Sequence, residues 1–270
     1  MKFSIVVASY KSEDRISALL DSLAVQTCKD FELIVQESGR SSSIAGIIKK
    51  YRAVLHVSHE VGIDTGIYDA WNKAIKRVTG QWVLFLGDDD QLAGSRVLET
   101  VSNHLDNTPD HVDIAYGRVE RVNESGASTV IGEEWAVARS ALHRCNPIPH
   151  QGVFHRRSVF LSKSFDENYK ICADYVFLFP ILSLREPMYI DMVVSKMSHG
   201  GISTSMRSQV MVGKELTSAY VELGISESFL SRARRLLAAR CKVMVCMILG
   251  ERVSASFFYS VKALTGSRVR

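Results

Sequence analysis

Residues 82–90 read Trp-Val-Leu-Phe-Leu-Gly-Asp-Asp-Asp and place five apolar residues almost directly before three consecutive carboxylates. An apolar run of this length is typical of a strand buried on both faces of a parallel sheet. Three adjacent carboxylates at the end of such a strand repel one another, and burial makes the repulsion worse. Oxygen ligands of this kind suit Mg²⁺ or Mn²⁺ together with substrate phosphates. The alternative is an acidic, solvated turn, because Asp also favours turns.

The chain before this strand alternates short apolar runs with segments whose apolar residues recur at helical spacing. This βαβαβαβ order predicts an α/β fold with a mainly parallel sheet flanked by helices. In such a sheet the ligand site lies at the carboxyl ends of the strands, where the aspartates fall. The predicted strands are 3–8, 31–35, 54–57 and 82–86, and helices are predicted after Ser12, over 44–51 and over 67–78, with Gly80 ending the last.

The second half of the chain has a less regular pattern. It predicts a helix over about 95–105, a strand over 114–119, a turn at 123–126 and a partner strand over 128–131. Residues 212–249 are expected to be mainly helical. The apolar content of 46% in 270 residues is enough for a full core.

Composition also bounds the location of the protein. The five cysteines have neither CxxC nor zinc-ligand spacing, which predicts reduced thiols and a cytoplasmic protein. The N-terminal apolar run is too short for a signal peptide, and no segment reaches the roughly 18 apolar residues that span a bilayer.

The C-terminal segment is strongly basic. Residues 232–270 hold nine basic residues and one acid, so the net charge of +4 splits into +8 there and −4 in the preceding 231 residues. Basic residues mixed with Leu, Met, Val and Phe suit a helix lying on an anionic membrane. The alternative is an ordinary packed helix with a solvated Arg face. A nucleic acid partner is not expected, because no binding motif accompanies the charges.

Several short stretches, in order along the chain, resemble one enzyme family. The most distinctive runs from Asp64 to Ile75, and the acidic strand end at 88–90 follows it. The chain is similar to the inverting, metal-dependent nucleotide-sugar glycosyltransferases of family 2, including those that build bacterial surface polysaccharides. The other matching stretches are Ser4–Tyr10, Asp21-Ser22-Leu23, Phe31–Val35, His150-Gln151, Phe165-Asp166, Ala173-Asp174-Tyr175 and Gly200–Ser203.

The resemblance covers about residues 3–200 and implies the GT-A fold, a Rossmann-like α/β architecture. It implies a glycosyltransferase domain over 1–205, followed by a basic helical extension over 206–270. Within the domain, residues 1–92 would form the nucleotide-sugar-binding half and 93–205 the acceptor-binding half.

The resemblance also implies which residues bind the donor and the metal. Asp90 is the expected direct ligand of Mn²⁺ or Mg²⁺, with Asp88 beside it. Residues at the first two strand ends hold the base and ribose, residues around the third helix line the donor side, and the aspartates lie near ribose and metal. The donor-binding set is Ser9, Tyr10, Glu37, Asp64, Asp69, Asn72, Lys73, Asp88 and Asp89.

On the acceptor side, Asp174 matches the position of the family's general base. Its alternative role is a helix N-cap for the run that begins at Tyr175. His150 is expected to bind substrate on the acceptor side or to anchor a loop. His199 would reach the metal or the diphosphate, or be a loop histidine without a ligand.

One segment departs from the family pattern. Where the family has Asp-Gly-Gly-Ser-Thr-Asp after the second strand, this chain has Glu37-Ser38-Gly39-Arg40-Ser41-Ser42. Glu37 keeps a carboxylate on a longer arm, Ser42 replaces the second acid and Arg40 adds a cation. Recognition of the nucleotide base is therefore expected to differ from the family pattern.

These observations predict a metal-dependent inverting glycosyltransferase of polysaccharide biosynthesis. It would transfer a sugar from a UDP- or GDP-sugar to a saccharide or lipid-linked acceptor, in the cytoplasm or on the cytoplasmic face of the inner membrane. One alternative is a sugar-nucleotide nucleotidyltransferase, although the chain lacks a Gly-rich basic N-terminal loop for a triphosphate. The other is a nucleotide-sugar-binding subunit that has lost catalysis, which only the altered 37–42 segment favours.

Overall fold

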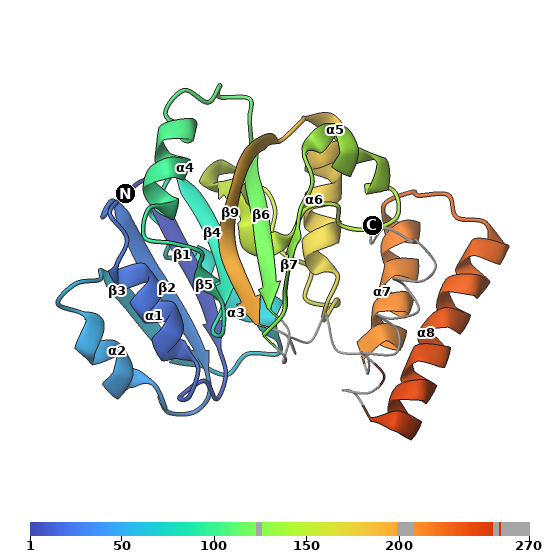
Figure 1. The fold of residues 1–270 in the computed structure, drawn as a ribbon, viewed down its shortest axis with the longest axis horizontal. Helices are drawn as coiled ribbons and strands as arrows, with labels where there is room; N and C mark the ends of the chain where they lie inside the picture. Colours follow the sequence, from blue (N-terminus) through green and yellow to red (C-terminus); the bar gives the residue numbers. More distant parts are fainter. Residues whose placement is uncertain (123–125, 199–207, 251–253, 255–270) are drawn as a thin grey trace. The chain divides into compact units, whose positions relative to one another are not determined.

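The computed structural model describes residues 1–122, 126–198, 208–250 and 254 and divides into two compact units. The first, here the sheet unit, comprises 1–142 and 146–198. The second, here the helical unit, comprises 143–145 and 199–270. Figure 1 shows the ribbon of both.

The sheet unit is built on a nine-stranded mixed sheet with the order β3-β2-β1-β4-β8-β6-β9-β5, and β7 pairs with β6. β3, β2, β1 and β4 run parallel, whereas β8 is antiparallel to both β4 and β6. β9 lies parallel to β6, as Figure 1 shows, and β5 is antiparallel to β9. The strands are β1 Phe3–Ser9, β2 Phe31–Ser38, β3 Val57–Gly62, β4 Trp82–Gly87, β5 Gln91–Leu92, β6 Ile114–Val122, β7 Ser128–Ile131, β8 Val153–Arg156 and β9 Met188–Ser198.

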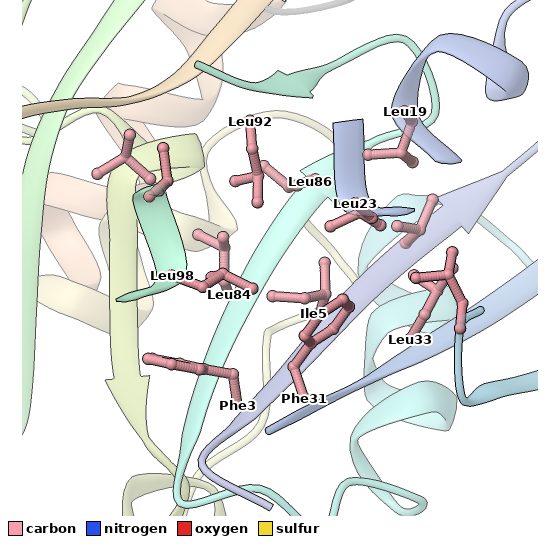
Figure 2. Packing of buried hydrophobic residues seen from close by; sticks show 14 of the residues in the cluster. Phe3, Ile5, Leu19, Leu23, Phe31, Leu33, Leu84, Leu86, Leu92 and Leu98 are labelled. Carbon is pink, nitrogen blue, oxygen red and sulfur yellow. The ribbon is translucent and has the colours of Figure 1, made fainter. Parts of the chain in front are cut away.

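Both faces of the sheet are covered, because successive side chains of a strand point to opposite faces. On one face, Phe3, Ile5 and Leu84 belong to a hydrophobic core with residues of α1, α2 and α4 (Figure 2). On the other face, Phe85 of β4 contacts aromatic side chains that include Trp71 of α3. The helices of this unit are α1 Ile16–Ala24, α2 Ala45–Tyr51, α3 Ile67–Ile75, α4 Val97–Leu105, α5 Trp135–Ala138 and α6 Ala173–Leu184.

The predicted α/β order is confirmed, but three element boundaries were wrong. The first helix begins at Ile16, because the Ser12 hydroxyl pairs with the Ser9 hydroxyl instead of capping the helix. The third strand is 57–62, because the amides of Val54 and Leu55 hydrogen-bond to the Tyr51 carbonyl and close α2.

Gly80 does not end the third helix, which stops at Ile75. A Cβ at position 80 would lie 2.5 Å from the carbonyl carbon of Phe3, so Gly80 allows the chain to pass close to β1. Its amide donates to the Ser4 hydroxyl at 2.9 Å. The glycine therefore serves a close backbone approach and not a helix cap.

The helical unit contains α7, Gln209–Glu222, and α8, Phe229–Leu249. Gly213 allows the helices to approach, since a Cβ there would lie 3.3 Å from Leu236 Cδ2. Arg235 joins them by donating to the Gly213 carbonyl at 2.7 Å and pairing with Glu227 at 2.6 Å. None of the helices in the described part of the chain has the length and apolar character needed to cross a bilayer.

Candidate active site

The parallel register brings the first predicted binding residues to one edge of the sheet. Ser9 lies beside Glu37 in the β1–β2 pairing, and Ala8 lies beside Gly87 in the β1–β4 pairing. The segments that follow β1 and β4 therefore begin next to each other at this edge of the sheet. The Tyr10 amide donates to Asp88 Oδ2 at 3.3 Å, and the Tyr10 side chain is 60% exposed.

Asp88 also binds a residue that the sequence analysis did not single out. Arg15, immediately before α1, donates from Nη2 to both oxygens of Asp88 at 3.2 Å. The two residues are 73 positions apart, and only the pairing of β1 with β4 brings them together. Arg15 thus supplies a cation at the edge where the aspartates converge.

The three aspartates that follow β4, here the aspartate cluster, differ in environment. Asp90 is 2% exposed, and its Oδ2 accepts the Gly87 amide at 2.6 Å. Asp89 is partly exposed. Gly87 makes room for both, since a Cβ there would lie 2.9 Å from Asp89 Oδ1 and 3.0 Å from Asp90 Oδ2.

Burial is the largest cause that raises the pKa of Asp90, to about 7, and the charges of Asp89 and Asp88 add to it. Burial together with Asp88 also raises the pKa of Asp89. The cluster thus carries more negative charge than its surroundings stabilise, and its donors are hard oxygens, which fits a divalent cation.

Within the described residues, no group of three or more His, Cys, Asp or Glu side chains is arranged to enclose a metal. An ion at the cluster would therefore complete its shell with water and substrate oxygens, the usual habit of Mg²⁺. His199, the predicted additional contact, lies outside the described residues.

Glu37 lies at the end of β2, and both oxygens of its carboxylate accept two hydrogen bonds each. Its Oε1 accepts the amide and hydroxyl of Ser43 at 2.7 and 2.9 Å, and its Oε2 accepts from Ser42 at 2.6 Å and His59 at 2.8 Å. Burial alone would raise the pKa of Glu37, but these hydrogen bonds outweigh it and lower the pKa. Since a carboxylate has about four lone-pair sites, Glu37 organises the loop that follows β2.

Asp64, Asp69 and Lys73 form one network at the start of α3. Lys73 Nζ donates to Asp64 Oδ1 at 2.7 Å, to Asp69 Oδ2 at 2.9 Å and to the Ile63 carbonyl at 2.8 Å. Asp69 also accepts the Thr65 amide at 2.8 Å. The second oxygen of Asp64 is buried and has no hydrogen-bond partner in the structure. The network fixes the loop that leads into α3.

Asn72, on the same helix, connects α3 to a distant loop. Its Nδ2 donates to the Phe165 carbonyl at 2.9 Å and to Glu167 Oε1 at 2.9 Å, while its Oδ1 accepts the Phe165 amide at 3.0 Å. All these partners are protein groups. Asn72 therefore holds the segment that leads towards Asp174.

Asp174 is the second residue of α6, whose N-cap position is Cys172. The N-cap alternative is therefore wrong, because the helix begins one residue before Asp174. Oδ2 of Asp174 accepts Nδ2 of Asn146 at 2.9 Å. Burial raises the pKa of Asp174, although hydrogen bonds from Asn146, from backbone amides and from Tyr68 act in the opposite direction. A carboxyl with a raised pKa and fixed orientation suits a general base.

His150 lies in a buried aromatic cluster on the second face of the sheet. Its ring stacks on Trp71 at 5.0 Å and on Phe85 at 5.5 Å between centroids. Neither ring nitrogen has a hydrogen-bond partner in the structure, and burial lowers its pKa to about 3. The neighbouring His155 donates from Nδ1 to the Val83 carbonyl at 3.3 Å. His150 is therefore a neutral residue of the buried core.

Known proteins share both the sequence pattern and the fold. The family model for glycosyl transferase family 2 matches residues 4–168. A PGL/p-HBAD biosynthesis glycosyltransferase of Mycobacterium tuberculosis (strain ATCC 25177 / H37Ra) is 30% identical over 218 residues, 76% of this chain and 80% of that protein. The poly(ribitol-phosphate) beta-N-acetylglucosaminyltransferase TarS of Staphylococcus aureus (strain Mu50 / ATCC 700699) is 31% identical over 140 residues, 50% of this chain and 24% of TarS.

Two solved structures show the same fold. Residues 1–349 of S. aureus TarS in complex with UDP give a TM-score of 0.64 at 22% identity, covering 87% of this chain and 70% of that one. The mannosyltransferase PcManGT from Pyrobaculum calidifontis, in complex with GDP-Man and Mn²⁺, gives 0.67 at 13% identity and covers 99% and 81%.

The mixed sheet flanked by helices, shared with these structures, is the GT-A fold of glycosyltransferases. The match over residues 4–168 and the 30% identity to the mycobacterial enzyme go further: the chain belongs to glycosyltransferase family 2. The predicted family, fold and enzyme class are confirmed.

Proposed function

We propose that this enzyme is a metal-dependent inverting glycosyltransferase. It transfers a sugar from a UDP- or GDP-sugar to a saccharide or lipid-linked acceptor in the synthesis of a surface polysaccharide. The observation that carries the proposal is the edge of the sheet where Tyr10, Arg15 and Asp88 meet beside the buried Asp90. The related structures of TarS in complex with UDP and of PcManGT in complex with GDP-Man and Mn²⁺ support a nucleotide-sugar donor.

Asp88 and Asp90 are the proposed ligands of Mn²⁺ or Mg²⁺, which would supply charge neutralisation for the departing diphosphate. Ser9, Tyr10, Asp64 and Asp89 are proposed to face the donor. Glu37, Asp69, Asn72 and Lys73 are proposed to act on the donor through the loops that they fix, since the structure uses their polar groups for contacts within the protein. His150 would support the acceptor side through its aromatic neighbours.

The proposed reaction is a single displacement. Asp174 accepts the proton of the acceptor hydroxyl while the hydroxyl oxygen forms a bond to the anomeric carbon of the sugar. The bond from that carbon to the diphosphate oxygen breaks, and its electron pair leaves with the nucleoside diphosphate. Because attack and departure occur on opposite faces, the anomeric configuration inverts. No second carboxylate nucleophile of the kind found in retaining glycosidases is required.

The proposed division of the chain into functional parts follows the one expected from the sequence. We propose that residues 1–92 bind the donor and 93–205 bind the acceptor, and that 206–270 are a separate basic extension whose described part is mainly helical. Since a lipid-linked acceptor lies at a membrane surface, the proposed location is the cytoplasmic face of the inner membrane.

Thermal stability of the purified protein tests the donor half of the proposal. UDP, GDP, CDP and dTDP are compared, each with and without Mn²⁺, because a ligand that binds only the native state raises its stability. A rise with UDP or GDP that requires the metal is expected. A rise with neither nucleotide in the presence of metal would contradict the proposed donor class.

A further inference from the structure

Helix α8 has an inner and an outer face of different character. On the inner face, Ala239 and Cys246 are buried at 8% and 3% exposure, and Arg235 reaches back to α7. The outer face carries large apolar side chains that are mostly exposed. They are Leu230, Leu237, Met244 and Ile248, at 68%, 63%, 57% and 73% exposure.

These four residues form one continuous strip, here the outer strip. Their spacings of seven, seven and four positions repeat close to the helical period, so the side chains lie in line along the helix. At 3.6 residues per turn, the 21 residues of α8 span roughly 30 Å. A long apolar strip on the exposed side of a helix marks a surface for a partner.

Positive charge borders the outer strip on both sides. A turn of about 100° per residue places Arg234 and Arg240 each about 60° from the middle of the strip, on opposite sides. Both arginines are exposed. The helix contains no Asp or Glu anywhere from Phe229 to Leu249, so no acid within α8 neutralises them.

We propose that the outer strip of α8 docks on an anionic phospholipid surface, with the helix lying in the plane of the membrane. The apolar side chains would enter the boundary between headgroups and acyl chains, and Arg234 and Arg240 would contact lipid phosphates. This inference concerns α8 alone and does not depend on the sugar donor or on Asp174.

The charge pattern favours lipid over a second copy of this chain. Two copies packed strip against strip would bring four arginines together without an acid from either α8 helix, and like charges at an interface disfavour association. An anionic membrane offers an apolar interior and negative phosphates together. The helix lies on the surface because it is not apolar enough to cross the bilayer.

Sedimentation with phosphatidylcholine vesicles, with and without phosphatidylglycerol, tests the proposal. The full chain is expected to bind the anionic vesicles and to bind less as salt rises. The double variant Leu237→Glu/Met244→Glu should lower binding at least about tenfold, because it removes two inserted side chains and adds two negative charges. Leu161→Glu is the matched control, since Leu161 is 86% exposed in the sheet unit, and it should bind as the parent does.

A second variant separates the role of charge. Arg234→Gln/Arg240→Gln should weaken binding to anionic vesicles and reduce its salt dependence. Circular dichroism checks that α8 remains helical in both double variants, and nucleotide-induced thermal stabilisation, if present in the parent, should be unchanged in both. The proposal is overturned if the parent does not bind anionic vesicles, or if the double Glu variant binds them as well as the parent.

Tryptophan fluorescence tests which face of α8 contacts the membrane. In a Leu237→Trp variant, brominated lipids should quench the new emission, whereas Arg232→Trp, about 140° away around the helix, should be quenched much less. Equal quenching at the two positions would contradict docking through the outer strip. Loss of self-association in Leu237→Glu/Met244→Glu, with no vesicle binding by the parent, would identify a second copy as the partner and overturn the lipid proposal.

Discussion

The side-chain amide of Asn146 donates a hydrogen bond from Nδ2 to Oδ2 of Asp174 across 2.9 Å. The two residues come from different segments, the loop that follows α5 and the first turn of α6. The hydroxyl of Tyr68, which donates to the Ile171 carbonyl at 2.6 Å, also acts on Asp174 and lowers its pKa. Hydrogen bonds from neighbouring residues therefore hold the carboxyl group of the proposed base in a fixed orientation.

Substitution of Asp174 by Asn should remove transfer and preserve donor binding. Loss of a general base typically lowers the rate by a factor of about 10² to 10⁴. The check is product formation from a UDP- or GDP-sugar, with nucleotide binding followed by thermal stability. A variant that transfers sugar at the parental rate would exclude Asp174 as the base.

Substitution of Asn146 by Ala should shift the pH dependence of kcat/KM. The hydrogen bond from Asn146 lowers the pKa of Asp174, so its loss raises that pKa further. A base works when it is deprotonated, and the acidic limb of kcat/KM should therefore shift to higher pH. Asn168→Ala is the control, because the Asn168 side chain contacts the exposed loop at Asp166. An unchanged acidic limb in Asn146→Ala would argue against this positioning role.

Substitution of Asp90 by Ala should abolish the part of nucleotide binding that depends on metal. At a nucleotide concentration of 100 times Kd, the parent gains about 2.7 kcal/mol of stability, and the variant should lose most of that gain. The measurement is the melting temperature with UDP or GDP in the presence and absence of Mn²⁺. Asp166→Ala provides a comparison outside the aspartate cluster. Retention of the full metal-dependent gain would remove Asp90 from the metal site.

Acid stability should depend on His150. Burial lowers its pKa from the ordinary 6.5 to about 3, so the unfolded chain binds a proton that the native state resists. Stability from the neutral ring is therefore complete above about pH 6.5 and is lost as the pH falls towards 3. His150→Phe should lose less stability between pH 7 and 5 than the parent, as measured by urea unfolding. His111→Phe, at an exposed position, should follow the parent.

Much of the first half of the fold was predictable because three of its strands contain mostly apolar runs that are buried on both faces. β1, β2 and β4 show this pattern, and their parallel register then brings the predicted site residues together. β9 was missed because Asp191 and Lys196 interrupt it and its pairing with β6 shifts register near Gly117. β3 was misplaced because it is an edge strand, and its polar residues His59 and Glu60 interrupt the apolar pattern from which a strand is predicted.

The candidate site was predictable only in part. The aspartate cluster and Asp174 were identified from local patterns and family resemblance. Arg15, His59 and Asn146 were missed, because each acts on a partner 73, 22 or 28 positions away and has no local signal. The sequence also could not show that Glu37 would be saturated by its own loop, since that depends on where His59 and two serines come to rest.

The saturated carboxylate of Glu37 has a thermodynamic consequence for the proposed binding of the nucleotide. A loop that is already hydrogen-bonded before a nucleotide arrives loses little conformational freedom on binding, so less of the interaction energy is spent on ordering the chain. Such a loop also adapts poorly to a base of another shape. The loop from Glu37 to Ser43 would then be preorganised. The preference for one nucleotide over another would depend on the shape of this loop more than on any single contact.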